Sequence, residues 1–161
     1  MNETMLQPFQ LGSLTLPNRV VMTTVKLGYG TEKGEVTDQH IAFYVRRAKG
    51  GVGLITSEPM YVQPNGRELP TQLGIHTDEL LSGLRRLTQA IHAAGGLMMG
   101  HINHAGRAAN PKLIPAGELV SASDVLCPAN QVIPRPLTCS EIPEVVFTFG
   151  AAASPYPRGR F

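Results

Sequence analysis

The sequence predicts an α/β fold in which short apolar strands alternate with amphipathic helices. Three observations predict it. Apolar runs of strand length recur at residues 20–22, 52–56 and 97–102. Stretches with helical spacing separate them, at residues 38–49 and 78–94. The loops after the strands are long, whereas those after the helices are short and contain paired glycines.

Each helix has recognisable ends and one apolar face. Thr37 and Asp38 offer an N-cap and an acidic first turn for the first helix, and Gly50-Gly51 and Gly95-Gly96 are typical stop signals. The apolar positions recur three and four residues apart, which places them on one face. They are Ile41, Tyr44, Val45 and Ala48 in the first helix, and Leu80, Leu84, Leu87, Ile91 and Ala94 in the second.

This order favours about three N-terminal β/α units of a TIM (β/α)8 barrel, because barrels carry their chemistry on the loops that follow the strands. A doubly wound sheet is the alternative. The "GGVG" at 50–53 resembles a dinucleotide loop, but it precedes a strand, and phosphate-binding glycines follow one. After an irregular stretch at 108–140, Thr138 or Ser140 opens a third helical pattern.

Composition excludes several classes of function. The 161 residues are 42% hydrophobic and 16% charged, as in one ordinary folded domain. A net charge of +2 is too small to indicate nucleic acid or an anionic membrane as a partner. No apolar run approaches the roughly 20 residues of a membrane span. Cys127 and Cys139 lack a Cys-x-x-Cys pattern, so we expect free thiols and a cytoplasmic location.

Two histidines three residues apart stand in "MMGHINHAGR" at 99–108. On a helix both would share a face, but along a strand His101 and His104 point to opposite faces, which disfavours one shared metal ion. We therefore expect no metal site, and a metal-dependent TIM-barrel hydrolase using both histidines and a carboxylate is the least favoured alternative. His40 and His92 lie on expected helices, where we expect them at the surface or in helix packing.

Four motifs carry a resemblance to a known family. "LTLPNRVVM", "YVRRAKGGVGLITSE", "QLGIHTDELLSGLRRLTQAIHAAGG" and "HAGR" occur in order. The chain resembles the old yellow enzyme family of FMN-dependent NAD(P)H oxidoreductases, whose fold is a TIM barrel. We expect residues 1–153 to be the N-terminal part of such a barrel. Residues 154–161, "SPYPRGRF", are expected to be a tail outside the family, such as a frame change or an early stop would leave.

The resemblance implies FMN bound at the carboxyl ends of the strands, with NAD(P)H as co-substrate. The matching cofactor-binding residues are Thr24, Val25 and Lys26 after the first strand, Pro59 after the second, and His101 at the end of the third. In the family, the position after the first strand usually has proline and methionine before a Cys or Thr. The position matching Pro59 usually has a small residue, and the position matching His101 usually has glutamine. Pro59 offers no backbone N–H, and an imidazole cannot present the paired donor and acceptor of an amide.

The "HAGR" signature supplies His104 and Arg107, either as anchors of the loop after the third strand or as contacts to a small-molecule substrate. No catalytic residue is assigned, because the family's substrate-binding pair and tyrosine proton donor follow the fourth strand. The expected function is hydride transfer from NAD(P)H through FMN to an activated alkene, with the 161-residue chain alone inactive. The alternative is a non-catalytic fragment, or a module that associates with itself through open sheet edges.

Overall fold

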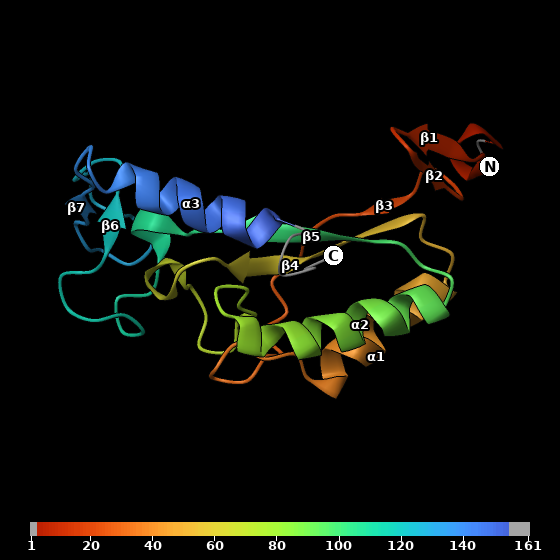
Figure 1. Cartoon of the computed structure of the whole chain (residues 1–161), viewed down its shortest axis with the longest axis horizontal. Coiled ribbons are helices and arrows are strands. Elements are labelled where there is room, and N and C mark those ends of the chain that lie inside the picture. Colours follow the sequence, from red (N-terminus) through yellow and green to blue (C-terminus); the bar gives the residue numbers. More distant parts are fainter. Residues whose placement is uncertain (1–2, 155–161) are drawn as a thin grey trace.

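A three-stranded parallel sheet is the centre of the molecule. The computed structural model describes residues 3–154, and its sheet has the order β3-β4-β5. The strands are β3 (Val21–Met22), β4 (Leu54–Tyr61) and β5 (Met98–Asn103), and both pairings are parallel, as predicted (Figure 1). The carboxyl ends of all three strands therefore lie at one end of the sheet.

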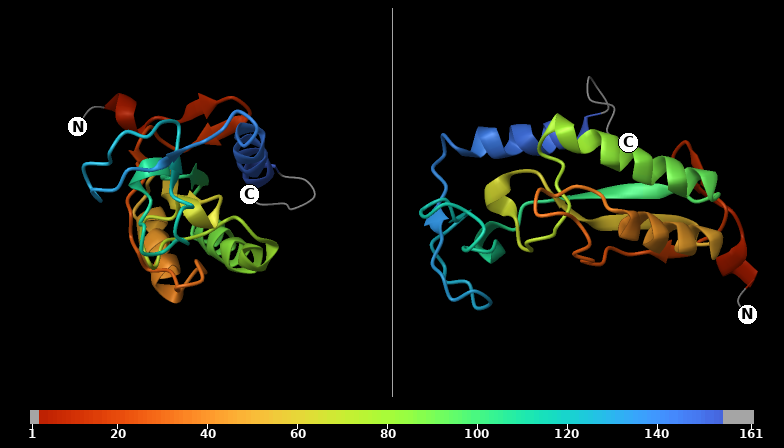
Figure 2. Two further views of the ribbon diagram at one scale, coloured as in Figure 1. Left: turned by 90° about the vertical axis from the view of Figure 1, so that its left-hand side faces the viewer. Right: turned by 90° about the horizontal axis from the view of Figure 1, so that it is seen from below.

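Three helices cover the sheet. α1 (Asp38–Lys49) connects β3 to β4, α2 (Leu81–Ala93) connects β4 to β5, and α3 (Ile142–Ala153) follows β5 after a long loop. Seen end-on in the left view of Figure 2, the helices follow one another in an arc around the strands. This is the arrangement of consecutive units in the wall of a barrel.

The apolar faces predicted from the helical spacing form the core. The largest buried side chains come from α1, β4, α2 and the loop between β4 and α2; they include Tyr44, Ile55, Met60, Leu73, Ile75, Leu84, Leu87 and Ile91. Gly51 and Gly95 have φ of +83° and +80°, so the left-handed stops expected after both helices are confirmed.

The prediction for the second strand was wrong in its bounds. β4 begins two residues later than expected and runs on to Tyr61, so Pro59 lies inside the strand and not after it. The pairing of β4 with β5 shifts register between Thr56 and Pro59. A proline is tolerated at such an irregularity because no ladder donor is needed there.

The start of the third helix also differs from expectation. α3 begins at Ile142, after Glu141, rather than at Thr138 or Ser140. The backbone N–H and the hydroxyl of Thr138 both donate to Glu141 Oε2, at 2.8 Å each. This closed turn occupies the capping groups of Thr138 and moves the first helical residue downstream.

Short elements were missed because two or three residues are too few for a periodic pattern. An antiparallel hairpin joins β1 (Phe9–Leu11) and β2 (Leu14–Leu16), and β6 (Val120–Ser121) pairs in parallel with β7 (Arg135–Pro136). The latter pair lies in the stretch expected to be irregular. Within the described residues the structure also contains four 3-10 turns, at Glu3–Leu6, Pro64–Gly66, Asp78–Leu80 and Gly106–Ala108.

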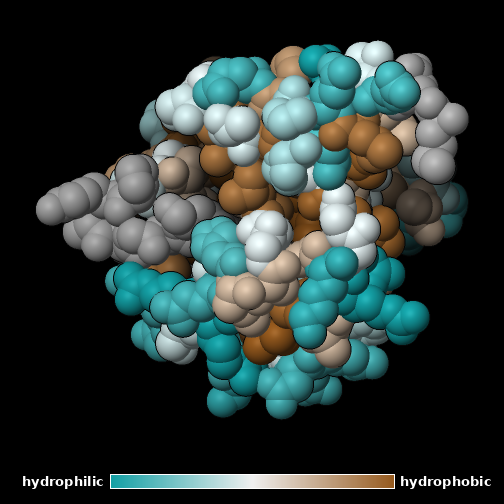
Figure 3. Space-filling model, turned by 90° about the vertical axis from the view of Figure 1, so that its right-hand side faces the viewer, coloured by the Kyte–Doolittle hydropathy of each residue, from teal (hydrophilic) through white to brown (hydrophobic). Residues whose placement is uncertain are grey.

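Apolar side chains reach the surface at the amino end of the sheet. Figure 3 shows this end of the molecule, with hydrophobic residues gathered in its middle between more hydrophilic ones. Val21 and Met99 on the strands are 45% and 48% exposed, and Leu11 and Leu14 of the hairpin are also exposed. The three strands thus leave apolar surface in contact with water.

Cys127 and Cys139 are free thiols, as expected, the first buried and the second exposed. None of the helices in residues 3–154 has the length and apolar character needed to span a bilayer. The expected tail at 154–161 falls, from residue 155 on, outside the described residues.

Candidate functional site

Thr24 and His101 meet at the carboxyl end of the sheet. The Thr24 hydroxyl donates to the Ser57 carbonyl oxygen at 2.8 Å, and His101 Nδ1 lies 3.0 Å from Thr24 Oγ1. Because the hydroxyl proton is already used, Nδ1 carries a hydrogen and donates to Thr24. In the neutral form of this ring the lone pair lies on Nε2, which has no hydrogen-bond partner within the described residues and can act as an acceptor.

Ser57 connects this pair to the sheet. Its Oγ accepts the backbone N–H of His101 at 2.8 Å and donates to the carbonyl oxygen of Glu58 at 2.8 Å. The bond from His101 links β5 to β4 within the stretch where the pairing of the two strands changes register, and the bond to Glu58 stays within β4. The side chain of Ser57 therefore takes over the pairing that the backbones lack there.

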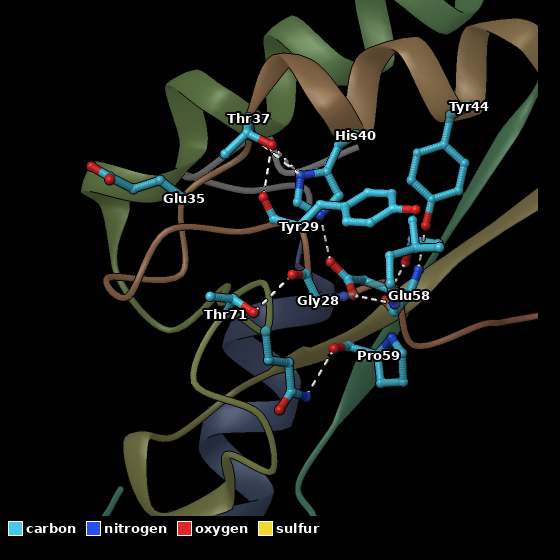
Figure 4. Close-up of polar contacts among 12 residues, drawn as sticks. Gly28, Tyr29, Glu35, Thr37, His40, Tyr44, Glu58, Pro59 and Thr71 are labelled. Atoms are coloured by element: carbon cyan, nitrogen blue, oxygen red, sulfur yellow. Dashed lines mark hydrogen bonds and ion pairs between the residues drawn. The ribbon is translucent and has the colours of Figure 1, made fainter.

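Glu58 is the centre of a buried polar network (Figure 4). Its side chain is fully buried, and Oε2 accepts the backbone N–H groups of Leu27 and Gly28 at 3.1 and 3.3 Å. His40 Nε2 lies 2.7 Å from Oε1. His40 Nδ1 accepts the Thr37 N–H at 3.2 Å, so Nε2 carries the hydrogen and donates to Glu58.

The network fixes the segment after β3. Three N–H groups compensate the buried carboxylate, and two of them belong to the backbone at Leu27 and Gly28. The Glu58 N–H donates to Tyr44 Oη at 2.7 Å, and burial raises the pKa of Tyr44 well above its usual value. The phenol therefore stays neutral at any physiological pH.

The loop after β4 is tied to the same strand ends. Gln72 Nε2 donates to the Pro59 carbonyl at 2.9 Å, and Thr71 Oγ1 donates to the Gly28 carbonyl at 2.8 Å (Figure 4). Both side chains satisfy backbone groups that the sheet leaves unpaired. Side chains from one strand and one loop thus hold the backbone around the candidate site.

The structure brings most of the predicted cofactor-binding residues together. Pro59 stands opposite His101 in the pairing of β4 with β5, and His101 turns toward Thr24 as expected. Val25 and Lys26 continue from Thr24 and are exposed. Lys26 Nζ forms an ion pair with Glu68 at 2.7 Å, so its charge is shared with an acid that sequence reasoning did not pair with it.

His104 holds the loops that follow β4 and β5. Its Nδ1 accepts the Gly106 N–H at 3.0 Å, and its Nε2 lies 3.2 Å from Asn65 Oδ1. Burial lowers the pKa of His104, which favours the neutral ring that these bonds require. A side chain at Gly66 would come within 2.7 Å of the imidazole, so only glycine fits there. The loop-anchoring interpretation describes these contacts.

Arg107 lies beside this loop without contributing a side-chain contact. It is exposed, and within residues 3–154 its guanidinium has no hydrogen bond or ion pair. Its carbonyl accepts the side-chain amide of Asn130 at 2.9 Å. The backbone of Arg107 thus belongs to the loop scaffold, and its charge is open to solvent.

The two histidines of "HINH" have different partners. His101 bonds to Thr24, whereas His104 bonds to Gly106 and Asn65. Across the described part of the chain, no group of three side chains of the metal-binding types is gathered. His101 and His104 therefore belong to different hydrogen-bond groups within residues 3–154.

Sequence reasoning missed the residues with the densest contacts. Ser57, Glu58 and His40 are at most 1% exposed, so of the two positions expected for His40, at the surface or in helix packing, the surface one is excluded. His92 is exposed. The available signal was the polar pair Ser57-Glu58 inside the apolar run "VGLITSEPMYV", because a charged residue in a buried strand requires a partner.

Residues 4–155 match the sequence model of the NADH:flavin oxidoreductase / NADH oxidase family. The chain belongs to this family. The match extends over nearly all of the 161 residues and includes every motif on which the resemblance rested. The assignment made from the sequence is confirmed.

Two curated relatives show the extent of the likeness. An NADH oxidase from Thermoanaerobacter brockii is 36% identical over 145 residues, which are 89% of this chain and 22% of that protein. An NADPH dehydrogenase from Listeria welshimeri serovar 6b is 37% identical over 147 residues, which are 90% of this chain and 42% of that protein. The chain spans less than half the length of either relative.

A solved structure confirms the fold class. The old yellow enzyme from Trypanosoma cruzi matches 98% of this chain and 49% of its own, with a TM-score of 0.82 and 28% sequence identity. The three parallel strands and their helices are therefore the first units of a TIM barrel, as the order of elements predicted.

Proposed function

We propose that this chain is the N-terminal portion of an FMN-dependent NAD(P)H oxidoreductase of the ene-reductase type. We also propose that the 161 residues alone do not catalyse the oxidation of NAD(P)H. The observation that carries the proposal is the meeting of Thr24, Pro59 and His101 at the carboxyl end of three parallel strands. Ligands of barrel enzymes bind at this end. Free cysteines support a location in the cytoplasm.

The residues present fit one edge of a flavin ring. The pyrimidine edge of isoalloxazine carries an N–H between two carbonyls, and neutral His101 offers an acceptor at Nε2 because Thr24 takes the Nδ1 hydrogen. The segment after β3, held by Glu58, supplies backbone beside it. When bound, FMN supplies the redox chemistry, taking a hydride from NAD(P)H and giving it to an activated alkene.

Each residue then has a limited task. Thr24 orients the imidazole, and Ser57 orients Thr24 through its carbonyl. Pro59 has no N–H, and its carbonyl already accepts a hydrogen bond from Gln72. Pro59 therefore contributes only its shape to the cofactor site. His101 makes one hydrogen bond where an amide would make two, which weakens retention of the flavin.

A chimera tests the proposal. The 147 matching residues of the Listeria NADPH dehydrogenase are replaced by the corresponding part of this chain, so that the relative supplies the rest of the barrel. We expect the purified chimera to bind FMN and to oxidise NADPH. His101→Gln in the chimera should retain FMN more tightly, whereas Lys49→Gln, on the exposed end of α1, should not change retention. A folded chimera that binds no FMN contradicts the proposal.

A second candidate function is self-association. The exposed Val21 and Met99 support it, because within residues 3–154 β3 and β5 each have one edge without a paired strand and apolar surface beside it. We expect sedimentation velocity to show dimers or larger species, and Met99→Lys to shift them toward monomer. Ala93→Lys, at an exposed position on α2, is the matched control. A monomer at all concentrations rules this candidate out.

A further inference from the structure

A pocket of about 460 Å³ opens at the carboxyl rim of the sheet. Loops that follow all three strands form it. Its polar lining is Lys26 after β3, Glu68 after β4, and Asn110 and Lys112 after β5, with Asn130 from the long loop. Lys26 belongs to the expected cofactor segment, so the pocket borders the candidate site.

The hydrogen-bonding groups left open in this pocket are mainly donors. Asn130 is used up, since its Nδ2 bonds the carbonyls of Arg107 and Ala109 and its Oδ1 accepts the Val132 N–H. Asn110 uses its oxygen on the Lys112 N–H, which leaves its NH2 group as donor.

The charges that line the pocket also favour an anionic ligand. Lys112 is exposed, and its ammonium has no ion pair or hydrogen bond within the described residues. Lys26 and Glu68 neutralise one another at 2.7 Å, so the lining keeps one net positive charge. A ligand with several acceptor oxygens and a negative charge would satisfy the ammonium of Lys112, the amide of Asn110 and the remaining hydrogens of Lys26 together.

We propose that this pocket binds the carboxylate or phosphate group of a small molecule, with Lys112, Asn110 and Lys26 as its donors. The proposal rests on the proposed function in one respect, namely that the bound molecule is a reactant. A carboxylate would then belong to an unsaturated acid that accepts the hydride, and a phosphate would belong to the nicotinamide nucleotide. Glu68 opposes binding, because it holds Lys26 and carries a like charge.

Ligand-observed NMR on the intact 161-residue chain, without FMN, measures binding directly. Saturation transfer measures the binding of fumarate, and the ³¹P line width measures the binding of inorganic phosphate, each at constant ionic strength. We expect saturable binding of at least one anion, with fumarate favoured if the ligand is an acceptor and phosphate if it is a nucleotide. Removal of one exposed lysine charge should weaken binding about two- to fivefold.

Four variants test the direction of each expected change in affinity. Lys112→Gln should weaken binding, Glu68→Gln should tighten it by a similar factor because it frees Lys26, and Lys49→Gln at the opposite end of the sheet should leave it unchanged. Lys112→Glu reverses the charge at this position and should weaken anion binding more than Lys112→Gln does. Equal affinities for Lys112→Gln and Lys49→Gln, or weaker binding in Glu68→Gln, overturn the proposal. Anion binding in a chain whose chimera takes up no FMN supports this pocket and removes only the proposed function.

Discussion

Glu58 shows at the level of one residue how the sheet positions the candidate site. Its carboxylate lies in the core yet contacts Leu27, Gly28 and His40, so the backbone after β3 depends on a side chain from β4. A buried acid of this kind stabilises a fold only while all its partners are present.

Replacement of Glu58 by alanine should therefore lower the free energy of unfolding by about 3 kcal/mol or more, because three N–H groups lose their acceptor in a buried place. Urea denaturation followed by circular dichroism measures it. Glu32→Ala, at an exposed position, is the control. A loss within about 0.5 kcal/mol would mean that water or another group replaces the carboxylate.

His104 makes a pH-dependent contribution. Burial lowers its pKa below the ordinary 6.5, so the folded state binds the extra proton less readily than the unfolded state. The stabilisation is complete above pH 6.5 and is lost as pH falls from there through the lower folded value. An NMR titration of the ring should give a midpoint below 6.5, and His104→Gln should flatten the fall in unfolding free energy. A midpoint at or above 6.5 contradicts the assignment.

At the scale of elements, periodicity was informative where several apolar residues repeat. The stripes of α1 and α2 predicted both helices within a few residues, and their glycine stops were confirmed. β4 was predicted too short because Glu58 and Pro59 interrupt its apolar pattern. Both residues are explained only by partners distant in sequence, His40 and the register shift against β5.

The turn before α3 provides an element-scale prediction. Arg135 donates to both carboxylate oxygens of Glu141, at 2.7 and 2.9 Å, and this bonding together with Thr138 lowers the pKa of Glu141 to about 2. The contribution to folding is present above the ordinary 4.5 and is lost as pH falls toward 2. Arg135→Gln should move the carboxyl titration, read by NMR, back toward 4.5. An unchanged midpoint would show that Thr138 alone holds the charge.

Across the whole molecule, the sequence predicted the family, because motifs such as "HAGR" occur in order, and it placed the candidate site at the carboxyl end of the sheet. It did not predict the internal supports of the site. Thr24 and His101 were expected to share a cleft. Their hydrogen bond to each other depends on Ser57, whose carbonyl takes the Thr24 hydroxyl hydrogen and so fixes Nδ1 of His101 as the donor. Only the three-dimensional pairing of β4 with β5 reveals this role of Ser57.

The incomplete wall of the barrel determines what the molecule can do alone. About three of the eight β/α units are present, and the strands leave Val21 and Met99 exposed. In the proposed function His101 contacts one edge of the flavin, and the other contacts come from barrel units outside these 161 residues. Hydride transfer requires the ring to be held and shielded, so these 161 residues should not catalyse it.

The most direct test is a turnover assay on residues 1–161 with added FMN, following NADPH loss with a quinone as acceptor. We expect a rate no higher than that of free FMN under the same conditions, while the chimera completed by the Listeria barrel oxidises NADPH. Turnover of the 161-residue chain well above that of free flavin would contradict this, and would mean that copies of the chain assemble into a working site.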